Sequence, residues 1–335
     1  MLGRIRLRWA WVRPLLGAGI LVVLVWRLGT RPFLEPLHRI DGWSLAAVAG
    51  ITVVTTTCCA WRWQLVSRAL GSELPLRPAV AAYYRAQFLN LVLPGGVLGD
   101  LHRALRRGLD VGDLRHSVRV VAWERGAGQV VQVALTTVVL LVLPSPVRSS
   151  MPVVVGAFVT AALCVVLLVR ALRGRGSGAL AGFARTLAAD LRGGLLARRV
   201  GPGVVLASVL VVVGHAATFL LAAHVAGSAV SPVRMLPLAL LVLLAAALPT
   251  NVAGWGPREG AAAWVFALAG LGAAQGVATA VVYGVLVLVA TLPGAAVLVV
   301  AWSRPRGIGP DAGGTGPGSP RRPAVAASRE GASRG

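Results

Sequence analysis

Two short segments place ionisable residues directly beside helix-breaking residues. The first, LPGGVLGDLHR, covers residues 93–103, and the second, LPTNVAGWGPREG, covers residues 248–260. Both contain the pattern L-P-x-x-V-x-G. Because glycine permits unusual backbone angles and proline suits the first turn of a helix, each segment is expected to end one helix and begin another. The residues that predict these breaks are Pro94, Gly95, Gly96, Gly99, Pro249, Gly254, Gly256 and Pro257.

The second break brings a guanidinium to the start of a helix. Glu259 is expected near the helix N-terminus, where the dipole favours a carboxylate and disfavours Arg258 unless an anion is present. Neighbours in sequence lie about 100° apart on a helix, so these two residues are not expected to neutralise each other. A helix N-terminus with an arginine is a natural phosphate receptor. The alternative is that Arg258 pairs with a carboxylate on another helix for structural reasons alone.

The first break offers a second set of polar residues. Asp100 is a candidate site residue, or simply the N-cap of the helix that follows. Arg103 is a candidate anion ligand, or a solvated or headgroup-facing residue of a basic loop. Tyr83, Gln87 and Asn90 are spaced i, i+4 and i+7 just before the break. They predict a polar stripe that faces protein or a cavity and not lipid.

Two apolar segments elsewhere contain isolated polar residues. Glu124 is expected to pair with Arg103 or Arg258, although a place at the cytoplasmic interface would also explain it. His215 lies in the middle of a span, where a hydrogen bond to a neighbouring helix is favoured over a proton relay. One further stripe on the helix of Glu124 consists of Arg125, Gln129 and Gln132.

The composition predicts an all-α polytopic membrane protein. The 335 residues are 56% hydrophobic and 13% charged, with a mean hydropathy of +0.77, and a soluble domain of this size could not hide so much apolar surface. A helix needs about 20 residues to cross the hydrocarbon layer. Segments 79–101 and 235–272 contain helices too short to cross, so they are predicted to be re-entrant or broken hairpins, in an arrangement typical of inverted repeats. Eight full spans are the alternative. The six predicted full spans are 9–28, 43–66, 118–143, 152–170, 203–227 and 276–302.

The distribution of arginine predicts the orientation. All 33 basic residues are arginine; with the N-terminus inside, 27 fall in cytoplasmic segments and 5 outside. This asymmetry predicts a multi-pass protein of the cytoplasmic membrane with both termini in the cytoplasm. It also explains the net charge of +22 without a nucleic-acid partner. Residues 1–302 are predicted to form the transmembrane domain, with a basic cytoplasmic linker at 171–200, and residues 303–335 a disordered tail.

Signatures of catalysis are missing from the sequence. It contains no Asp-x-Asp pair, no phosphate-binding GxxxxGK[ST] or GxGxxG motif and no metal-ligand spacing. We therefore expect no cofactor, no metal and no enzymatic activity.

Four blocks of sequence resemble the lysylphosphatidylglycerol synthase transmembrane family, also called the flippase-like domain family. They are RWQLVSRALG (62–71), FLNLVLPGGVLGDLHRALRRG (88–108), WERGAG (123–128) and LPTNVAGWGPREGAAAWVFALAGL (248–271). The resemblance covers about residues 10–302 and implies a helical bundle with re-entrant segments that binds phospholipids or polyprenyl-phosphate lipids. The resemblance to full-length members stops near Trp302, so we expect this chain to lack their aminoacyl-transfer domain. Functional positions implied by the resemblance are Pro94, Gly95, Gly96, Gly99, Asp100, Arg103, Glu124, Arg125, Gly254, Gly256, Arg258 and Glu259.

The expected function is therefore that of a lipid translocase or lipid-binding transporter, with the headgroup bound at the broken helices. The expected partners are anionic phospholipids or polyprenyl phosphates. A separate lipid-modifying enzyme or glycosyltransferase and a homo-oligomer are further possibilities. Two alternatives remain open: a catalytic or non-catalytic subunit of polyprenyl-phosphate sugar synthesis, and a structural anchor for another envelope protein.

Overall fold

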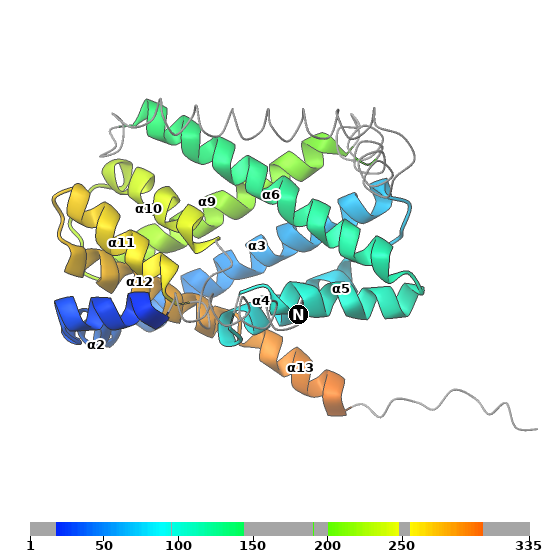
Figure 1. Cartoon of the computed structure of the whole chain (residues 1–335), viewed down its shortest axis with the longest axis horizontal. Helices are drawn as coiled ribbons and strands as arrows, with labels where there is room; N and C mark the ends of the chain where they lie inside the picture. Colours follow the sequence, from blue (N-terminus) through cyan, green and yellow to red (C-terminus); the bar gives the residue numbers. More distant parts are fainter. Residues whose placement is uncertain (1–17, 95, 144–189, 191–199, 248–254, 304–335) are drawn as a thin grey trace, which may run out of the picture.

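The computed structural model describes residues 18–94, 96–143, 190, 200–247 and 255–303. The regular elements within these ranges are helices (Figure 1). They are a helix at Ala18–Leu28, α2 (Arg31–Leu34), η1 (Glu35–Arg39), α3 (Gly42–Ala69), α4 (Leu76–Val92), α5 (Leu98–Val111), α6 (Leu114–Val142), α9 (Gly201–Val225), α10 (Pro232–Ala246), α11 (Pro257–Leu268), α12 (Ala273–Ala290) and α13 (Pro293–Ser303).

Four helical segments are long and apolar enough to cross a bilayer. They are α3, α6, α9 and the continuous stretch Ala273–Val300, which joins α12 and α13. Three match the predicted spans 43–66, 118–143 and 203–227, and the fourth matches 276–302. The predicted span 152–170 and the body of the linker 171–200 lie outside the described residues. Large apolar side chains such as Val130, Val138 and Leu141 of α6 point outward, as a lipid-facing surface requires.

Local sequence explains where the long helices begin. The side chain of Asp41 accepts a hydrogen bond from the Ser44 amide at 2.9 Å and caps α3. This bond to the charged form lowers the pKa of Asp41, which lies just before the span. Asp113 caps α6 in the same way through the His116 amide at 2.9 Å. Each cap satisfies one of the amide groups that a helix N-terminus leaves without a partner.

The two predicted breaks correspond to interruptions between helices. The first lies between α4 and α5, where Gly96 adopts a φ of 63° that favours glycine. At the second, α10 ends at Ala246 and α11 begins at Pro257, after Gly256 with a φ of 115°. The breaking residues Gly95, Pro249 and Gly254 lie outside the described residues.

The helices of the second half of the chain share one apolar core. α9, α10, α11 and α12 meet around Phe219, Phe266 and Leu240, which are almost fully buried. The Phe219 ring lies edge-on to Phe266, with centroids 6.4 Å apart, and 5.7 Å from Tyr283. α3 packs along α9 and contacts α4, α6 and α12, so it lies at the centre of the bundle (Figure 1).

Candidate functional site

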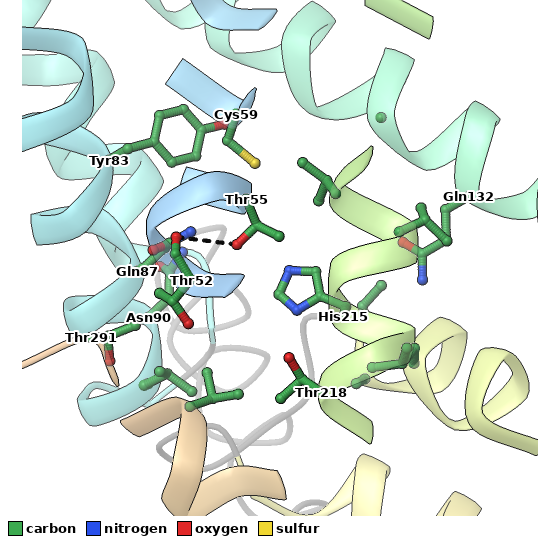
Figure 2. Close-up of a pocket in the computed structure, with 18 of the residues that line it drawn as sticks. Thr52, Thr55, Cys59, Tyr83, Gln87, Asn90, Gln132, His215, Thr218 and Thr291 are labelled. Atoms are coloured by element: carbon green, nitrogen blue, oxygen red, sulfur yellow. Dashed lines mark hydrogen bonds between the residues drawn. The ribbon is translucent and has the colours of Figure 1, made fainter. Parts of the chain in front are cut away.

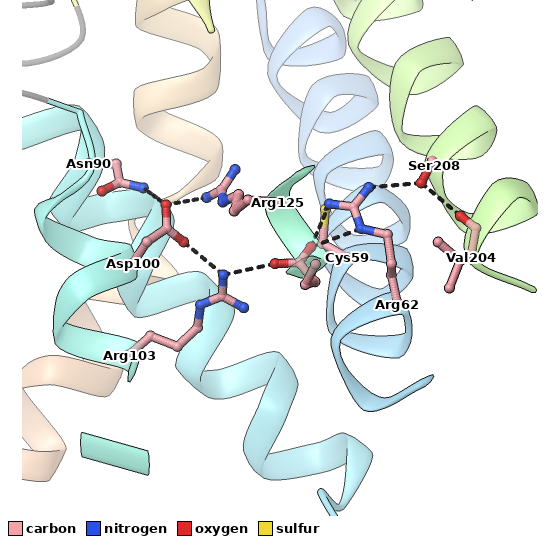
Figure 3. Close-up of polar contacts among 9 residues, drawn as sticks. Cys59, Arg62, Asn90, Asp100, Arg103, Arg125, Val204 and Ser208 are labelled. Atoms are coloured by element: carbon pink, nitrogen blue, oxygen red, sulfur yellow. Dashed lines mark hydrogen bonds and ion pairs between the residues drawn. The ribbon is translucent and has the colours of Figure 1, made fainter. Parts of the chain in front are cut away.

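Five ionised side chains from α3, α5 and α6 form a continuous chain of ion pairs, which we call the ionic chain (Figure 3). Arg62 donates from Nε and Nη2 to Glu124 Oε1 at 2.8 and 2.6 Å. Glu124 Oε2 accepts from Arg103 Nη2 at 3.0 Å, and the same nitrogen donates to Asp100 Oδ1 at 2.8 Å. Asp100 Oδ2 pairs with Arg125 Nη2 at 2.6 Å. The ionic chain thus begins and ends with an arginine.

The members of the ionic chain differ sharply in exposure. Glu124 is fully buried, and Arg103 and Arg62 are nearly so. The guanidinium of Arg103 lies between two aromatic rings, 4.5 Å from the centroid of Trp63 and 4.1 Å from that of Tyr83. In contrast, the side chain of Arg125 is 45% exposed. Arg125 is therefore the more accessible end of the ionic chain.

The break between α4 and α5 explains how Asp100 joins this chain. The side chain of Asn90 on α4 accepts from the Gly99 amide at 2.7 Å and donates to Asp100 Oδ2 at 3.0 Å. Gly99 has no Cβ, and a Cβ there would overlap the carbonyl oxygen of Ala86, so only glycine lets α5 approach α4 this closely. Because the Asn90 side chain accepts the hydrogen bond from the Gly99 amide in the first turn of α5, the carboxylate of Asp100 does not have to cap this helix and can bind arginines.

Two of the alternative roles given for this region are wrong. Asp100 is not the N-cap of the following helix, since Val97 occupies that position and Asp100 lies in the first turn of α5. Arg103 is not solvated, because it lies on the face of α5 that packs against the bundle, between the two rings. The predicted pairing of Glu124 with Arg103 is confirmed, whereas Glu124 is not paired with Arg258.

The second break holds an arginine and a glutamate that neutralise each other. Arg258 donates from Nε and Nη2 to Glu259 Oε1 at 2.9 and 2.5 Å, and Glu259 Oε2 accepts from the Gly256 amide at 2.6 Å. The prediction that these neighbours would not pair is wrong. Pro257 begins α11 as predicted, and in this first turn Glu259 folds back to cap the helix. Its carboxylate therefore comes within reach of the long Arg258 side chain.

The two breaks share a further feature. Arg103 follows Pro94 by nine residues, and Arg258 follows Pro249 by the same number. Like Arg103, Arg258 lies near two aromatic rings, 5.1 Å from the centroid of Trp255 and 5.3 Å from that of Tyr283. Each break therefore delivers one guanidinium to an aromatic pair, where the ring faces attract the cation.

A cavity of about 290 Å³ lies between the two breaks (Figure 2). Arg62 and Arg125 of the ionic chain line it, and so does Arg258 of the second break. The polar groups around it come from α3, α4, α6, α9, α11 and α12 and from Thr291, which directly follows α12. Besides the arginines they are Thr52, Thr55, Tyr83, Gln87, Asn90, Gln129, Gln132, Ser208, His215, Thr218, Tyr283 and Thr291.

Both predicted polar stripes face this cavity. Tyr83, Gln87 and Asn90 line it from α4, and Gln87 also accepts a hydrogen bond from the Thr56 hydroxyl at 2.9 Å. The stripe of Arg125, Gln129 and Gln132 lines it from α6. The stripe of Tyr83, Gln87 and Asn90, predicted to face protein or a cavity, thus lies at a cavity wall, and the α6 stripe lies there too.

His215 also lies at the cavity wall and contacts a neighbouring helix. Its Nδ1 is 3.1 Å from the hydroxyl of Tyr283 on α12. The predicted hydrogen bond of this histidine to another helix is therefore confirmed.

Sequence reasoning missed several residues that shape the site. Arg62 is one of the 27 arginines assigned to cytoplasmic segments, yet its Nη1 donates to Ser208 of α9 at 3.1 Å inside the bundle. Gly128 and Gly284 lie against arginines, since a Cβ at either would overlap the guanidinium of Arg62 or Arg258 respectively. The sequence does contain signals for these residues. Arg62 lies well inside a long helix, and Gly128 and Gly284 are isolated glycines within apolar helices.

These features are those of a helical, multi-pass membrane protein with an ion-paired polar cavity inside an apolar bundle. The chain belongs to the family described as the lysylphosphatidylglycerol synthase TM region, whose model matches residues 10–294. The family relates it to lipid synthesis or translocation. Neither a curated protein nor a solved structure matches the chain.

Proposed function

We propose that this protein is a lipid translocase or lipid-binding transporter of the cytoplasmic membrane. Its cargo would be a lipid with a phosphate-containing headgroup, either a phospholipid or a polyprenyl-phosphate-linked lipid. The observation that carries the proposal is the cavity itself: arginine and amide side chains line a space that is bordered by all four of the described helical segments long and apolar enough to span a bilayer. Ionisable residues within a membrane-spanning bundle are energetically costly and generally mark a pathway for a polar substrate.

The size of the cavity favours a headgroup over a whole lipid. At about 290 Å³ it is near the lower end of the volumes typical of small-molecule sites. Such a space suits a phosphate with a small substituent, whereas two acyl chains require far more room. The tails would therefore remain in the bilayer while the headgroup enters the bundle.

Guanidinium groups suit this task for two reasons. Arginine presents a planar set of donors that matches phosphate oxygens, and it stays charged inside a protein. The polar stripes of α4 and α6 add amide donors and acceptors along the same cavity, which would replace the hydration of the headgroup.

The test is headgroup translocation in proteoliposomes. Vesicles carry a phospholipid labelled with the fluorophore NBD on an acyl chain, and dithionite added outside destroys only the label in the outer leaflet. Wild type is compared with Arg125→Gln, which removes the exposed guanidinium of the cavity. Arg115→Gln is the matched control, because Arg115 is exposed near the start of the same helix and does not line the cavity.

The expected result is that wild type and Arg115→Gln speed the loss of inner-leaflet fluorescence, while Arg125→Gln does not, at equal incorporation and thermal stability. The proposal fails if folded wild-type protein accelerates neither phospholipid nor polyprenyl-phosphate movement and binds neither lipid.

A further inference from the structure

The charges around the cavity do not cancel. Three arginines and two carboxylates make up the ionic chain, which leaves one positive charge in excess. Arg258 and Glu259 cancel each other. The other ionisable lining residues, Cys59, Tyr83, His215 and Tyr283, are counted as neutral because an uncompensated charge in such a place is expensive. Among the described residues, the site therefore lacks one negative charge.

The excess charge can be assigned to one guanidinium. Arg62 uses Nε, Nη1 and Nη2 on Glu124 and Ser208, and Arg103 is enclosed by two rings. Arg258 has two nitrogens on Glu259. Among the described residues, Arg125 pairs ionically with Asp100 alone, through Nη2, and its side chain is 45% exposed. Because it also lines the cavity, its guanidinium is the one open to a ligand.

From these observations we infer that the cavity accepts one monoanionic phosphate, that is a phosphodiester-linked headgroup, with Arg125 as its direct ligand. This inference rests on the proposed function and narrows its substrate class. A phosphodiester carries one negative charge and would make the site neutral. A terminal phosphate monoester approaches two negative charges above pH 7 and would leave one charge unmatched in a water-poor space.

Both candidate lipid sources contain members of each ester type. Phosphatidylglycerol and a glycosylated polyprenyl phosphate are phosphodiesters, whereas phosphatidic acid and a bare polyprenyl phosphate are monoesters. The shared chemistry that the site selects is thus the ester type of the phosphate and not the hydrocarbon to which it is attached.

The experiment compares NBD-acyl phosphatidylmethanol with NBD-acyl phosphatidic acid in the proteoliposome assay. These two probes differ by one methyl group on the phosphate. At pH 8 the monoester is mostly dianionic and imidazole is ordinarily neutral. We expect wild type to move the phosphatidylmethanol probe roughly tenfold faster or more, the effect of about one unmatched charge. Equal rates, or faster movement of phosphatidic acid, would overturn the inference while leaving the proposed function intact.

Two variants raise the net charge of the site by one and should shift the preference towards the monoester. Asp100→Asn raises the excess of the ionic chain from one charge to two and keeps a side chain of the same shape. Gln129→Lys adds a positive charge at the cavity wall, one turn beyond Arg125, and removes no member of an ion pair. It replaces Asp100→Asn in the test if that variant does not fold. Either variant should shift the rate ratio at least severalfold towards phosphatidic acid, and an unchanged ratio in a folded variant contradicts the inference.

Unlabelled competitors then distinguish the lipid source. Glucosyl polyprenyl phosphate and phosphatidylglycerol are added at equal mole fraction, each beside its monoester counterpart. Stronger competition by one phosphodiester identifies the hydrocarbon that the protein takes. If both monoesters compete better than both phosphodiesters, the assignment of a monoanionic site is wrong.

Discussion

Glu124 is the residue on which the ionic chain depends most, and Glu124→Gln is the change that tests it. The carboxylate is fully buried and accepts three charge-assisted hydrogen bonds, at 2.8 and 2.6 Å from Arg62 and at 3.0 Å from Arg103. Glutamine keeps the shape of the side chain but removes its charge. Three arginines would then face one carboxylate, Asp100.

The expected loss follows from that geometry. Breaking a buried pair by removing one partner costs about 3–5 kcal/mol, because the remaining charge has no compensation. We expect a loss in this range in the free energy of unfolding, measured by titrating the protein in mixed micelles with SDS and following tryptophan fluorescence. Glu35→Gln is the matched control, since Glu35 is exposed and makes no ion pair in the described part of the chain. It should change stability by less than about 0.5 kcal/mol.

A double variant separates charge imbalance from lost packing. Arg62→Gln combined with Glu124→Gln restores the excess of one positive charge, so it should recover about 1–3 kcal/mol relative to the sum of the single losses. The reasoning is refuted if Glu124→Gln is as stable as Glu35→Gln. It is refuted equally if the double variant is no better than that sum.

Two more predictions concern the glycines and the start of α3. Gly284→Ala should destabilise the protein and reduce lipid movement, because the new Cβ would overlap the guanidinium of Arg258; Gly50→Ala, with open space around it, should gain up to about 1 kcal/mol in the same SDS titration. The lowered pKa of Asp41 means that its cap is fully present above about pH 4 and is lost as pH falls through the depressed value. Asp41→Asn should therefore show a flatter decline in thermal stability on acidification than wild type, and parallel declines would contradict that role.

Much of the fold could be predicted because the length of each apolar segment can be read from the sequence. Each matched span contains a long apolar run, and the breaks are marked by proline and glycine beside polar residues. Both polar stripes were predictable for the same reason, since i, i+4 and i+7 spacing places Tyr83, Gln87 and Asn90 on one face of a helix whatever lies opposite.

The pairing of charges could not be predicted, because it depends on which helices meet. Arg62 and Glu124 are far apart in sequence and contact only because α3 crosses α6. From the sequence, Asp100 could be the N-cap of the helix that follows. In the structure the Asn90 side chain of α4 accepts the hydrogen bond from the Gly99 amide at the start of α5, and only the packing of α4 against α5 shows this. The Arg258–Glu259 pair was missed for a local reason, since ideal helix angles do not describe a long side chain that folds over the first turn.

The two breaks are alike in sequence and unlike in charge. Both present an arginine to two aromatic rings at the same distance from a proline. Arg258 takes its counterion from the adjacent residue, so the second break is neutral before any ligand arrives. Arg103 takes its counterions from Glu124 and Asp100, which also hold Arg62 and Arg125, and this sharing leaves the excess charge at the first break. An anionic headgroup in the cavity should therefore bind first on the Arg125 side, because Arg258 already has a counterion in Glu259. This ordering predicts that Arg125→Gln lowers the affinity for the headgroup, whereas Arg258→Lys, which keeps the charge but loses the two-nitrogen contact with Glu259, chiefly slows its passage.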